Sequence, residues 1–262
     1  MAVLLDYQHV EVSFNGEPVV HDVSFQLHPG EILGLVGESG SGKSTLIKAA
    51  MGLLGSSGMV TRGDIWFEGK SLPDVPPKEL RRICGEKIGM IFQDCGASLS
   101  PTRTIGEQII ESMAAHRKVD VAEAKRAALE LFEKLHFQDG EWIWDSYPFE
   151  LSGGMNQRAG IAIAMLMNPA VLLADEPTSA LDMAVQRQVV EEMLHVREAF
   201  GTAIIIVTHD IGVVSAMADS IVVLSNGRVM EYGTAKDVLE NPQNDYTVKL
   251  LSAVPRLRRE KA

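Results

Sequence analysis

The sequence of 262 residues is short of positive charge, with 24 Lys and Arg residues against 35 Asp and Glu and a formal net charge of −11. Proteins that bind nucleic-acid backbones concentrate Lys and Arg, because their affinity is largely electrostatic. The one basic cluster is RLRRE near the end of the chain, which is typical of a solvated tail. We therefore expect no extended nucleic-acid surface and no nucleic-acid partner.

Cysteine and long hydrophobic runs are also scarce. Cys84 and Cys95 are the only cysteines, and they form neither a metal-spaced set nor a disulfide framework, so we expect free thiols in a reducing compartment. The longest apolar stretches, such as AIIIV and VLLA, are far shorter than the roughly 20 residues of a membrane-spanning helix. The N-terminal MAVLLDYQHVEVSF has the pattern of a strand, with an acid at position 6, rather than of a signal peptide. We expect a chain that is soluble by itself and reaches a membrane only through a partner.

Hydrophobic residues make up 46 % of the chain, enough for a substantial core, and their patterning predicts an α/β fold. Strand patterns come first, in VEVSF, VVHDVSFQL, EILGLVG and GDIWFEG, and Asn15-Gly16 predicts a hairpin between the first two. Residues 101–144 are rich in helix formers, which predicts a small helical insertion. AVLLA and AIIIV are apolar throughout, as in parallel strands covered by helices, and a helix over QRQVVEEMLHVREAF separates them.

The segment GESGSGKS, Gly37 to Ser44, matches the phosphate-loop spacing G-x-x-x-x-G-K-[ST] between a predicted strand and a predicted helix. Its glycines let backbone N–H groups turn inward around phosphates. Lys43 would reach the β- and γ-phosphates, and the Ser44 hydroxyl would coordinate Mg²⁺. The alternative is a Gly/Ser loop with an accidental lysine, which the strand–loop–helix context argues against.

VLLADE supplies the acids that such a site requires. Asp175 would hold Mg²⁺ through water, and Glu176 would polarise the attacking water. The alternative is an acidic turn at the end of a strand. A second polar glycine turn, LSGGMNQR at residues 151–158, runs into the helical pattern IAIAMLM, with a helix expected to begin near Asn156. By itself it could be a helix cap with Ser152 at the N-cap. The chain thus has two turns suited to anions.

Five segments occur in the order seen in ATP-binding cassette (ABC) ATPases, and together they resemble that family from Phe14 to about Gly233: GESGSGKST, FQD at 92–94, LSGGMNQR, VLLADEPTSALD and IIIVTHD. The resemblance implies a phosphate-loop NTPase (RecA-like) fold: a parallel sheet core, an N-terminal antiparallel β subdomain and an inserted helical subdomain. We expect a single domain at 1–262, with the core at 1–93 and 156–262 and the helical insertion at 94–155.

The resemblance also implies roles for individual residues. Glu176, His209, Gln93 and Lys43 would be catalytic, and Ser44, Gln93 and Asp175 would hold Mg²⁺. Phe14 matches an aromatic that stacks on adenine, although core packing is an equal alternative for it. The loop 179–182 (SALD) would couple two sites across a dimer. The ATP-binding set comprises Phe14, Gly37, Glu38, Ser39, Gly40, Ser41, Gly42, Lys43, Ser44, Thr45, Gln93, Ser152, Gly153, Gly154 and Asp182.

In that family two subunits pair head to tail, and the LSGG turn of one caps the γ-phosphate held by the other. This implies a second ATPase subunit, identical or different, and explains the two anion turns as halves of a composite site. It also implies two transmembrane permease subunits, an extracytoplasmic solute-binding protein acting indirectly, and a peripheral place on the cytoplasmic face of the membrane. ATP and Mg²⁺ are the expected ligands.

Three further stretches resemble the ATPases of peptide and nickel importers: IGMIFQDCGASLSP, DSYPFELSGGM and NPQNDYTVKLLSAVP. Four positions depart from those patterns: Cys95, Ser100, Phe149 and Asp245. They put in doubt which substrate branch of the subfamily the chain resembles, but not its ATPase activity. Because there is no cysteine beyond position 95, we expect the short form of this subfamily and no iron–sulphur cluster.

Two other classes are weighed against the importer. Proteins similar to the DNA-repair or translation-linked ABC class have long coiled-coil insertions or two cassettes in one chain. This chain has one cassette and no heptad run. A phosphate-loop kinase for a small metabolite would leave LSGGMNQR and SALD without a role.

Overall fold

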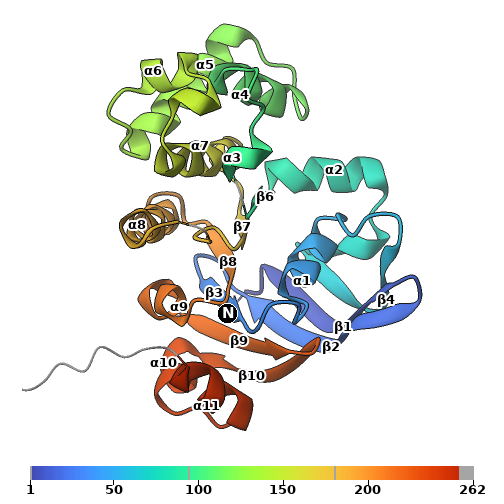
Figure 1. The fold of residues 1–262 in the computed structure, drawn as a ribbon. Coiled ribbons are helices and arrows are strands. Elements are labelled where there is room, and N and C mark those ends of the chain that lie inside the picture. The colour runs from blue at the N-terminus through green and yellow to red at the C-terminus, as the bar shows by residue number, and fades with distance from the viewer. Residues whose placement is uncertain (1, 94, 180, 254–262) are drawn as a thin grey trace, which may run out of the picture.

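We describe a computed structural model of the chain, which covers residues 2–93, 95–179 and 181–253. The described chain forms two sheets with helices around them and a helical lobe at one end (Figure 1). The closing segment RLRRE lies outside the described residues, as do Asp94 and Ala180.

The first sheet is antiparallel, with the strand order β2-β1-β4-β5. Its hairpin turns at Asn15 and Gly16, whose φ angles of 51° and 85° are those that a two-residue hairpin turn requires. The predicted hairpin is therefore confirmed. The strands are β1 (Leu5–Phe14), β2 (Glu17–Leu27), β4 (Gly58–Phe67) and β5 (Lys70–Ser71).

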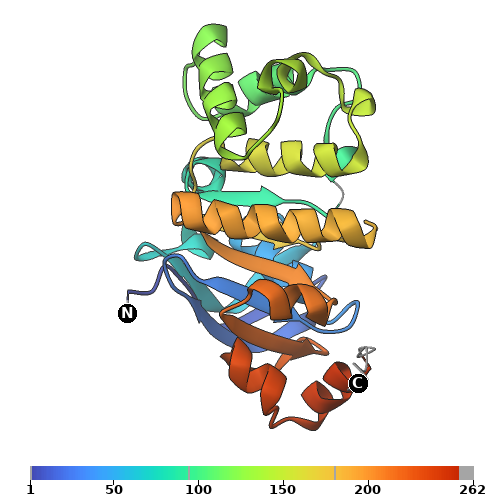
Figure 2. The same cartoon turned by 90° about the vertical axis from the view of Figure 1, so that its left-hand side faces the viewer.

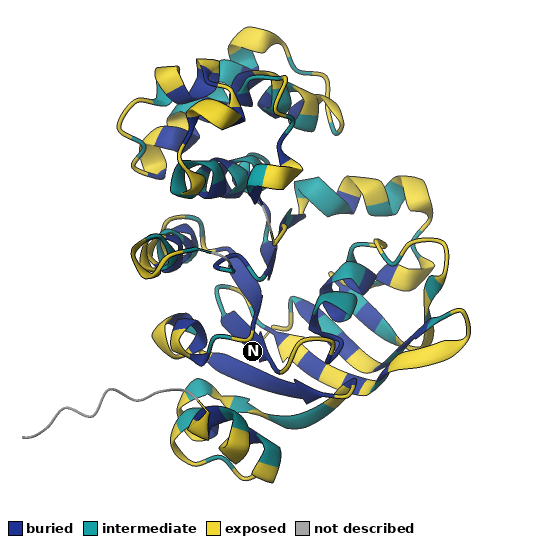
Figure 3. Cartoon of the chain, viewed as in Figure 1, coloured by how far each residue is buried: buried dark blue, intermediate teal, exposed yellow. Residues whose placement is uncertain are grey.

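The second sheet has the order β10-β9-β3-β8-β7-β6, and all its neighbours are parallel except β10, which runs antiparallel to β9. The strands β3, β7, β8 and β9 are buried along their whole length (Figure 3), as expected for parallel strands covered on both faces. The strands are β3 (Ile32–Val36), β6 (Ile88–Ile91), β7 (Val171–Asp175), β8 (Ala203–Thr208), β9 (Ser220–Ser225) and β10 (Arg228–Thr234).

Helix α1 (Lys43–Ala50) lies between the two sheets, and its Leu46 and Ile47 belong to an apolar cluster to which both sheets contribute. The opposite face of the parallel sheet packs in another cluster with α8 (Met183–Phe200) and α9 (Ile211–Met217). Helices α10 (Ala235–Glu240) and α11 (Asp245–Ser252) follow β10 and pack at the other end of the core (Figure 1). This arrangement confirms the predicted phosphate-loop α/β fold with an N-terminal antiparallel sheet.

The helical lobe contains α3 (Cys95–Ser98), α4 (Ile105–Ala114), α5 (Val121–Lys134), α6 (Gly140–Asp145) and the short η2 (Pro148–Glu150). Helix α7 (Gly153–Met165) contacts α3 on the lobe side and β6 and α8 on the core side (Figure 2). A boundary at residue 155 would lie inside α7, because that helix begins at Gly153. The extent of the insertion stays a prediction.

Sequence analysis names no helix between the strand GDIWFEG and β6, but the structure has η1 (Leu72–Asp74) and α2 (Pro77–Glu86) there. Pro77 occupies the first helical position, where its missing N–H costs nothing. None of the helices in the described part of the chain combines the length and the apolar character needed to cross a bilayer.

Candidate functional site

The phosphate loop connects β3 to α1, as the sequence predicts. Gly37 and Gly42 have φ angles of 152° and 98°. A Cβ atom added to Gly37 would lie 2.1 Å from the Leu224 carbonyl oxygen, and one added to Gly42 would lie 3.1 Å from Val20 Cγ2. Since the loop has no room for side chains at these two positions, its backbone can curl tightly enough to present amide groups to an anion.

Lys43 and Ser44 begin α1 and face the acidic end of β7. Lys43 is buried as a residue, and its ammonium donates hydrogen bonds of 2.8 Å to the carbonyl oxygens of Gly37 and Glu38. Burial lowers the pKa of Lys43, and the nearby carboxylates of Glu176 and Asp175 partly oppose that shift. The Ser44 hydroxyl donates to Asp175 Oδ1 over 2.6 Å.

Asp175 and Glu176 differ in their surroundings. Asp175 ends β7, is buried, and has its second oxygen 3.8 Å from Lys48 Nζ. Glu176 has a φ angle of 46°, which is uncommon for a residue other than glycine, and its amide donates to the Val207 carbonyl. This conformation turns its carboxylate to within 3.3 Å of Nδ1 of His209, which follows β8. Strained backbone of this kind gathers at functional sites.

Lys43, Ser44, Glu176 and His209 surround one cavity of about 670 Å³, and Asp175 reaches it through its hydrogen bond with Ser44. Among the described residues it is lined by the phosphate-loop residues Gly37, Glu38, Ser39, Gly40, Gly42, Lys43, Ser44 and Thr45, by Gln93, Glu176 and His209, and by Val19 and Leu250. Ser41 belongs to the loop but not to the described lining, and its hydroxyl is buried. The structure therefore brings together the predicted loop, the predicted base, the glutamine and the histidine. The hydroxyl of Ser44, the carboxylate of Asp175 and the amide of Gln93 supply hard oxygen donors, which suit Mg²⁺.

Phe14 lies outside the described lining of this cavity. Its half-buried ring packs on Gly58, where an added Cβ would be 2.6 Å from Phe14 Cε1. The structure thus shows the core-packing contact that was one of the two interpretations of Phe14, and stacking on adenine stays a prediction. Val19 and Leu250 contribute the apolar side chains of the cavity instead, and sequence analysis missed both.

The second glycine turn also stands apart from the described cavity lining. Ser152 and Gly153 are exposed, and Ser152 is the N-cap of α7, accepting a hydrogen bond from the Met155 amide. The expectation that this helix begins near Asn156 is wrong, because α7 begins about one turn earlier, at Gly153. The Ser152 hydroxyl accepts from the Met155 amide, which would otherwise lack a partner in the first turn. Asp182 caps α8 in the same manner, through the amides of Ala184 and Val185. The two helix starts pack together, since a Cβ on Gly154 would lie 3.1 Å from Val185 Cγ1.

Gln157 is a buried residue of the second turn whose role sequence analysis missed. Its amide Nε2 donates a 2.8 Å hydrogen bond to the carbonyl of Pro177, the residue after Glu176. The sequence could have indicated this role, because Gln157 is a polar residue at a position where the apolar pattern of α7 predicts a buried side chain. The bond ties α7 to the acidic end of β7.

Residues 20–179 match the family model described as "ABC transporter". The chain belongs to the ABC transporter family. It is therefore an ABC ATPase, as the resemblance implies. Residues 230–262 match a second model, the oligopeptide/dipeptide transporter C-terminal region.

This ABC ATPase is 42 % identical to the oligopeptide transport ATP-binding protein OppD of Salmonella typhimurium over 264 residues, which cover 99 % of this chain and 78 % of the relative. It is 41 % identical to the dipeptide transport ATP-binding protein DppD of Lactococcus lactis, over 96 % of this chain and 74 % of that one.

Solved ABC structures are similar as well. CbiO1 from Clostridium perfringens, part of the transporter complex cbiONQ, superposes with a TM-score of 0.79 at 27 % identity, covering 91 % of each chain. The dimeric post-hydrolysis state of the cassette MJ0796, bound to ADP and Pi, gives a TM-score of 0.75 at 28 % identity, over 88 % of this chain and 99 % of that chain.

Proposed function

We propose that this ABC ATPase powers an importer, hydrolysing ATP in a head-to-tail pair of ATPase subunits to drive uptake of peptides through a membrane permease. The observation that carries the proposal is the separation of the two anion turns. One lines the nucleotide cavity, and the other is exposed at the start of α7, outside the described lining of that cavity. A turn that is exposed and rich in free amides suits an anion held by another molecule.

Within one chain, the loop amides and Lys43 hold the ATP phosphates. A Mg²⁺ ion held by Ser44, Asp175 and Gln93 would neutralise phosphate charge. The Glu176 carboxylate accepts a proton from water, whose oxygen bonds to the γ-phosphorus as the bond to the ADP oxygen breaks. His209, 3.3 Å from Glu176, orients that carboxylate and contacts the γ-phosphate.

The remaining contacts to the nucleotide come from the partner subunit. Its Ser152, Gly153 and Gly154 cap the γ-phosphate, and its loop 179–182 with Asp182 couples the two sites. Hydrolysis removes the group that both subunits hold, so the pair separates. The packing of the α7 and α8 starts supports this arrangement, because it fixes the serine turn and the Asp182 cap on one surface.

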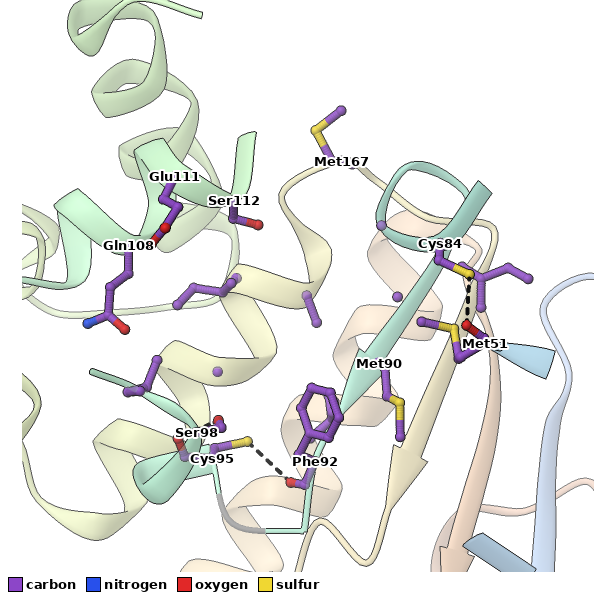
Figure 4. A pocket seen from close by; sticks show the side chains of 18 residues that line it. Met51, Cys84, Met90, Phe92, Cys95, Ser98, Gln108, Glu111, Ser112 and Met167 are labelled. Atoms are coloured by element: carbon purple, nitrogen blue, oxygen red, sulfur yellow. Dashed lines mark hydrogen bonds between the residues drawn. The ribbon is translucent and has the colours of Figure 1, made fainter. Parts of the chain in front are cut away.

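A second cavity, of about 430 Å³, lies between the core and the helical lobe (Figure 4). Its sides come from Met90 of β6 and the adjoining Phe92, from Cys84 of α2 and from Gln108 of α4. Phe92 is 45 % exposed and precedes Gln93. A protein segment held between the two lobes is displaced when they move, so we assign the permease contact to this cavity. The ATPase then sits on the cytoplasmic face of the membrane.

The relatives support a choice of cargo. The OppD and DppD names and the C-terminal match favour peptides, and nickel or a metal chelate is the second candidate because of the stretch at 88–101. A solute-binding protein outside the cell would select it. Deleting the gene should abolish uptake of a labelled oligopeptide, a labelled dipeptide or nickel, and normal uptake of all three would contradict the importer.

The enzyme itself is tested in the assembly isolated from detergent-solubilised membranes. Glu176→Gln should bind ATP normally and lower the hydrolysis rate by about 10²- to 10⁴-fold, the range for removal of a general base. Ser152→Arg should abolish hydrolysis, whereas the same change at Ser215, exposed on α9, should not. Undiminished turnover in Glu176→Gln, or indifference to Ser152→Arg, would contradict the mechanism. Copurification with DNA or ribosomes in place of membrane proteins would favour the non-transport ABC alternative.

A further inference from the structure

The C-terminal helix α11 packs beside the nucleotide site. Its Tyr246, Leu250 and Leu251 belong to an apolar cluster that also includes Val36 and Ile211. Val36 is the last residue of β3, directly before the phosphate loop, and Ile211 lies two residues beyond His209. The helix therefore rests on the segments that carry Lys43 and His209.

Two side chains of α11 reach the site. The backbone amide of Glu38, in the phosphate loop, donates a hydrogen bond to the Tyr246 hydroxyl over 3.3 Å. Leu250, one turn further along the helix, lines the nucleotide cavity together with Lys43 and Gln93. Neither contact follows from the phosphate-loop or LSGG motifs, because α11 lies more than 200 positions from the loop in the sequence.

Helix α11 is fixed in place at its first residues. Asn244 is its N-cap, accepting from the Tyr246 amide, and its side-chain amide donates to the Met230 carbonyl. The Glu231 carboxylate of β10 accepts from the amides of Gln243 and Asn244 over 2.8 and 3.2 Å. Since these bonds connect α11 to the sheet, the helix can hold the phosphate loop in one geometry.

A phosphate loop works when its amides are pre-set around the anion, so that binding does not have to order them. We propose that Tyr246 is a positioning residue for the nucleotide phosphates, acting through the Glu38 amide, and that Leu250 contributes binding surface to the same cavity. This assignment rests on the proposed function of the cavity as the ATP site. It gives the C-terminal region a direct part in nucleotide affinity.

The first experiment compares two tyrosines in the full chain. Tyr246→Phe removes the hydroxyl but keeps the ring, and should raise the dissociation constant for MANT-ATP and the KM for ATP about fivefold, with kcat changed less than twofold. Tyr232→Phe is the matched control, because the Tyr232 hydroxyl also accepts from a backbone amide, that of Gln26, but outside the described cavity lining. It should leave both constants unchanged.

The second experiment uses charge. Leu250→Glu places a carboxylate beside the phosphates and should weaken MANT-ATP binding at least tenfold, with the effect shrinking at high salt. Leu250→Gln introduces a side chain of the same size as glutamate but without its charge, so it measures the effect of lost apolar packing alone. Val248→Glu makes the same charge change at an exposed position of α11 outside the described cavity lining, and should weaken binding less than twofold.

Wild-type affinity in Tyr246→Phe, or equal losses in Tyr246→Phe and Tyr232→Phe, would overturn the role of Tyr246. Equal effects of Leu250→Glu and Val248→Glu would overturn that of Leu250. If wild type and both controls bind and hydrolyse ATP while the test variants match them, only this inference fails. If wild type binds no ATP, the proposed function fails with it.

Discussion

Replacing Gln157 by methionine tests whether α7 is tied to the acidic end of β7. Methionine has nearly the length and volume of glutamine, so the change removes the hydrogen bond to the Pro177 carbonyl and opens little space. Gln157 and Pro177 are both buried, so the Pro177 carbonyl oxygen would lose its donor in a buried place. Leaving a buried acceptor unpaired costs about 1–3 kcal/mol, so we expect a loss of that size in the free energy of unfolding.

The measurement is urea unfolding followed by circular dichroism, analysed at constant slope so that a midpoint shift reports stability. Gln188→Met is the control, since Gln188 is exposed on α8 and should change stability by less than about 0.5 kcal/mol. Because Pro177 follows Glu176, Gln157→Met should also lower the ATPase rate at saturating ATP. Equal stability of the two variants would refute the argument about the hydrogen bond. A loss of stability with an unchanged ATPase rate would refute the link between that bond and Glu176.

Two further predictions concern backbone space and titration. Gly37→Ala should abolish ATP binding, because its Cβ would meet the Leu224 carbonyl, while Gly69→Ala, with a positive φ angle but open space, should bind ATP normally; isothermal titration calorimetry checks both, and binding by Gly37→Ala would contradict the loop geometry. For Glu231, burial raises the pKa, but hydrogen bonds that include those from Gln243 and Asn244 outweigh it, leaving the pKa below 4.5. A depressed pKa stabilises the folded state above the unfolded-state value and stops doing so as pH falls through the folded-state value. Glu231→Gln should thus be less stable than wild type at pH 7, with the difference shrinking below about pH 4.5; a difference independent of pH would contradict this.

Local chemistry made much of the core predictable. The Asn15-Gly16 hairpin, the strand–loop–helix around Lys43 and the buried strand ending at Asp175 each follow from residues that are neighbours in the chain. Turn glycines, a capping polar residue and apolar strands act over a few positions, so their pattern is legible without a structure.

The misses have a different physical origin. Tyr246 and Leu250 reach the phosphate loop only because β10 and α11 fold back beside β3, and no local pattern encodes that contact. From the sequence alone, core packing and stacking on adenine are equally good interpretations of Phe14. Its packing on Gly58 depends on the pairing of β1 with β4, which lies far away in the sequence. Helix α7 begins at Gly153 rather than near Asn156, because the Ser152 cap outweighs the low helix propensity of the two glycines that follow it.

The phosphate loop and the exposed serine turn have separate supports within one chain. The loop is held by α11 and by the turn between β9 and β10, where the Gly227 amide donates to the Ser41 carbonyl over 3.0 Å. The serine turn is held by the packing of α7 on α8, at Gly154 and Val185. Parts with separate supports can move relative to each other, as the proposed composite sites require of their two halves.

Gln157 connects the helix of the serine turn to the acidic end of β7. It lies on the helix that Ser152 caps, and it bonds to the residue after Glu176. In the proposed pair, the Ser152 turn contacts the γ-phosphate bound by the partner, while Glu176 acts on the nucleotide bound by its own chain. A displacement of α7 on loss of that phosphate is therefore transmitted through Gln157 to the backbone beside the chain's own base. Loosening that bond should make the two hydrolysis events more independent, so Gln157→Met should show a lower Hill coefficient for ATP than Gln188→Met.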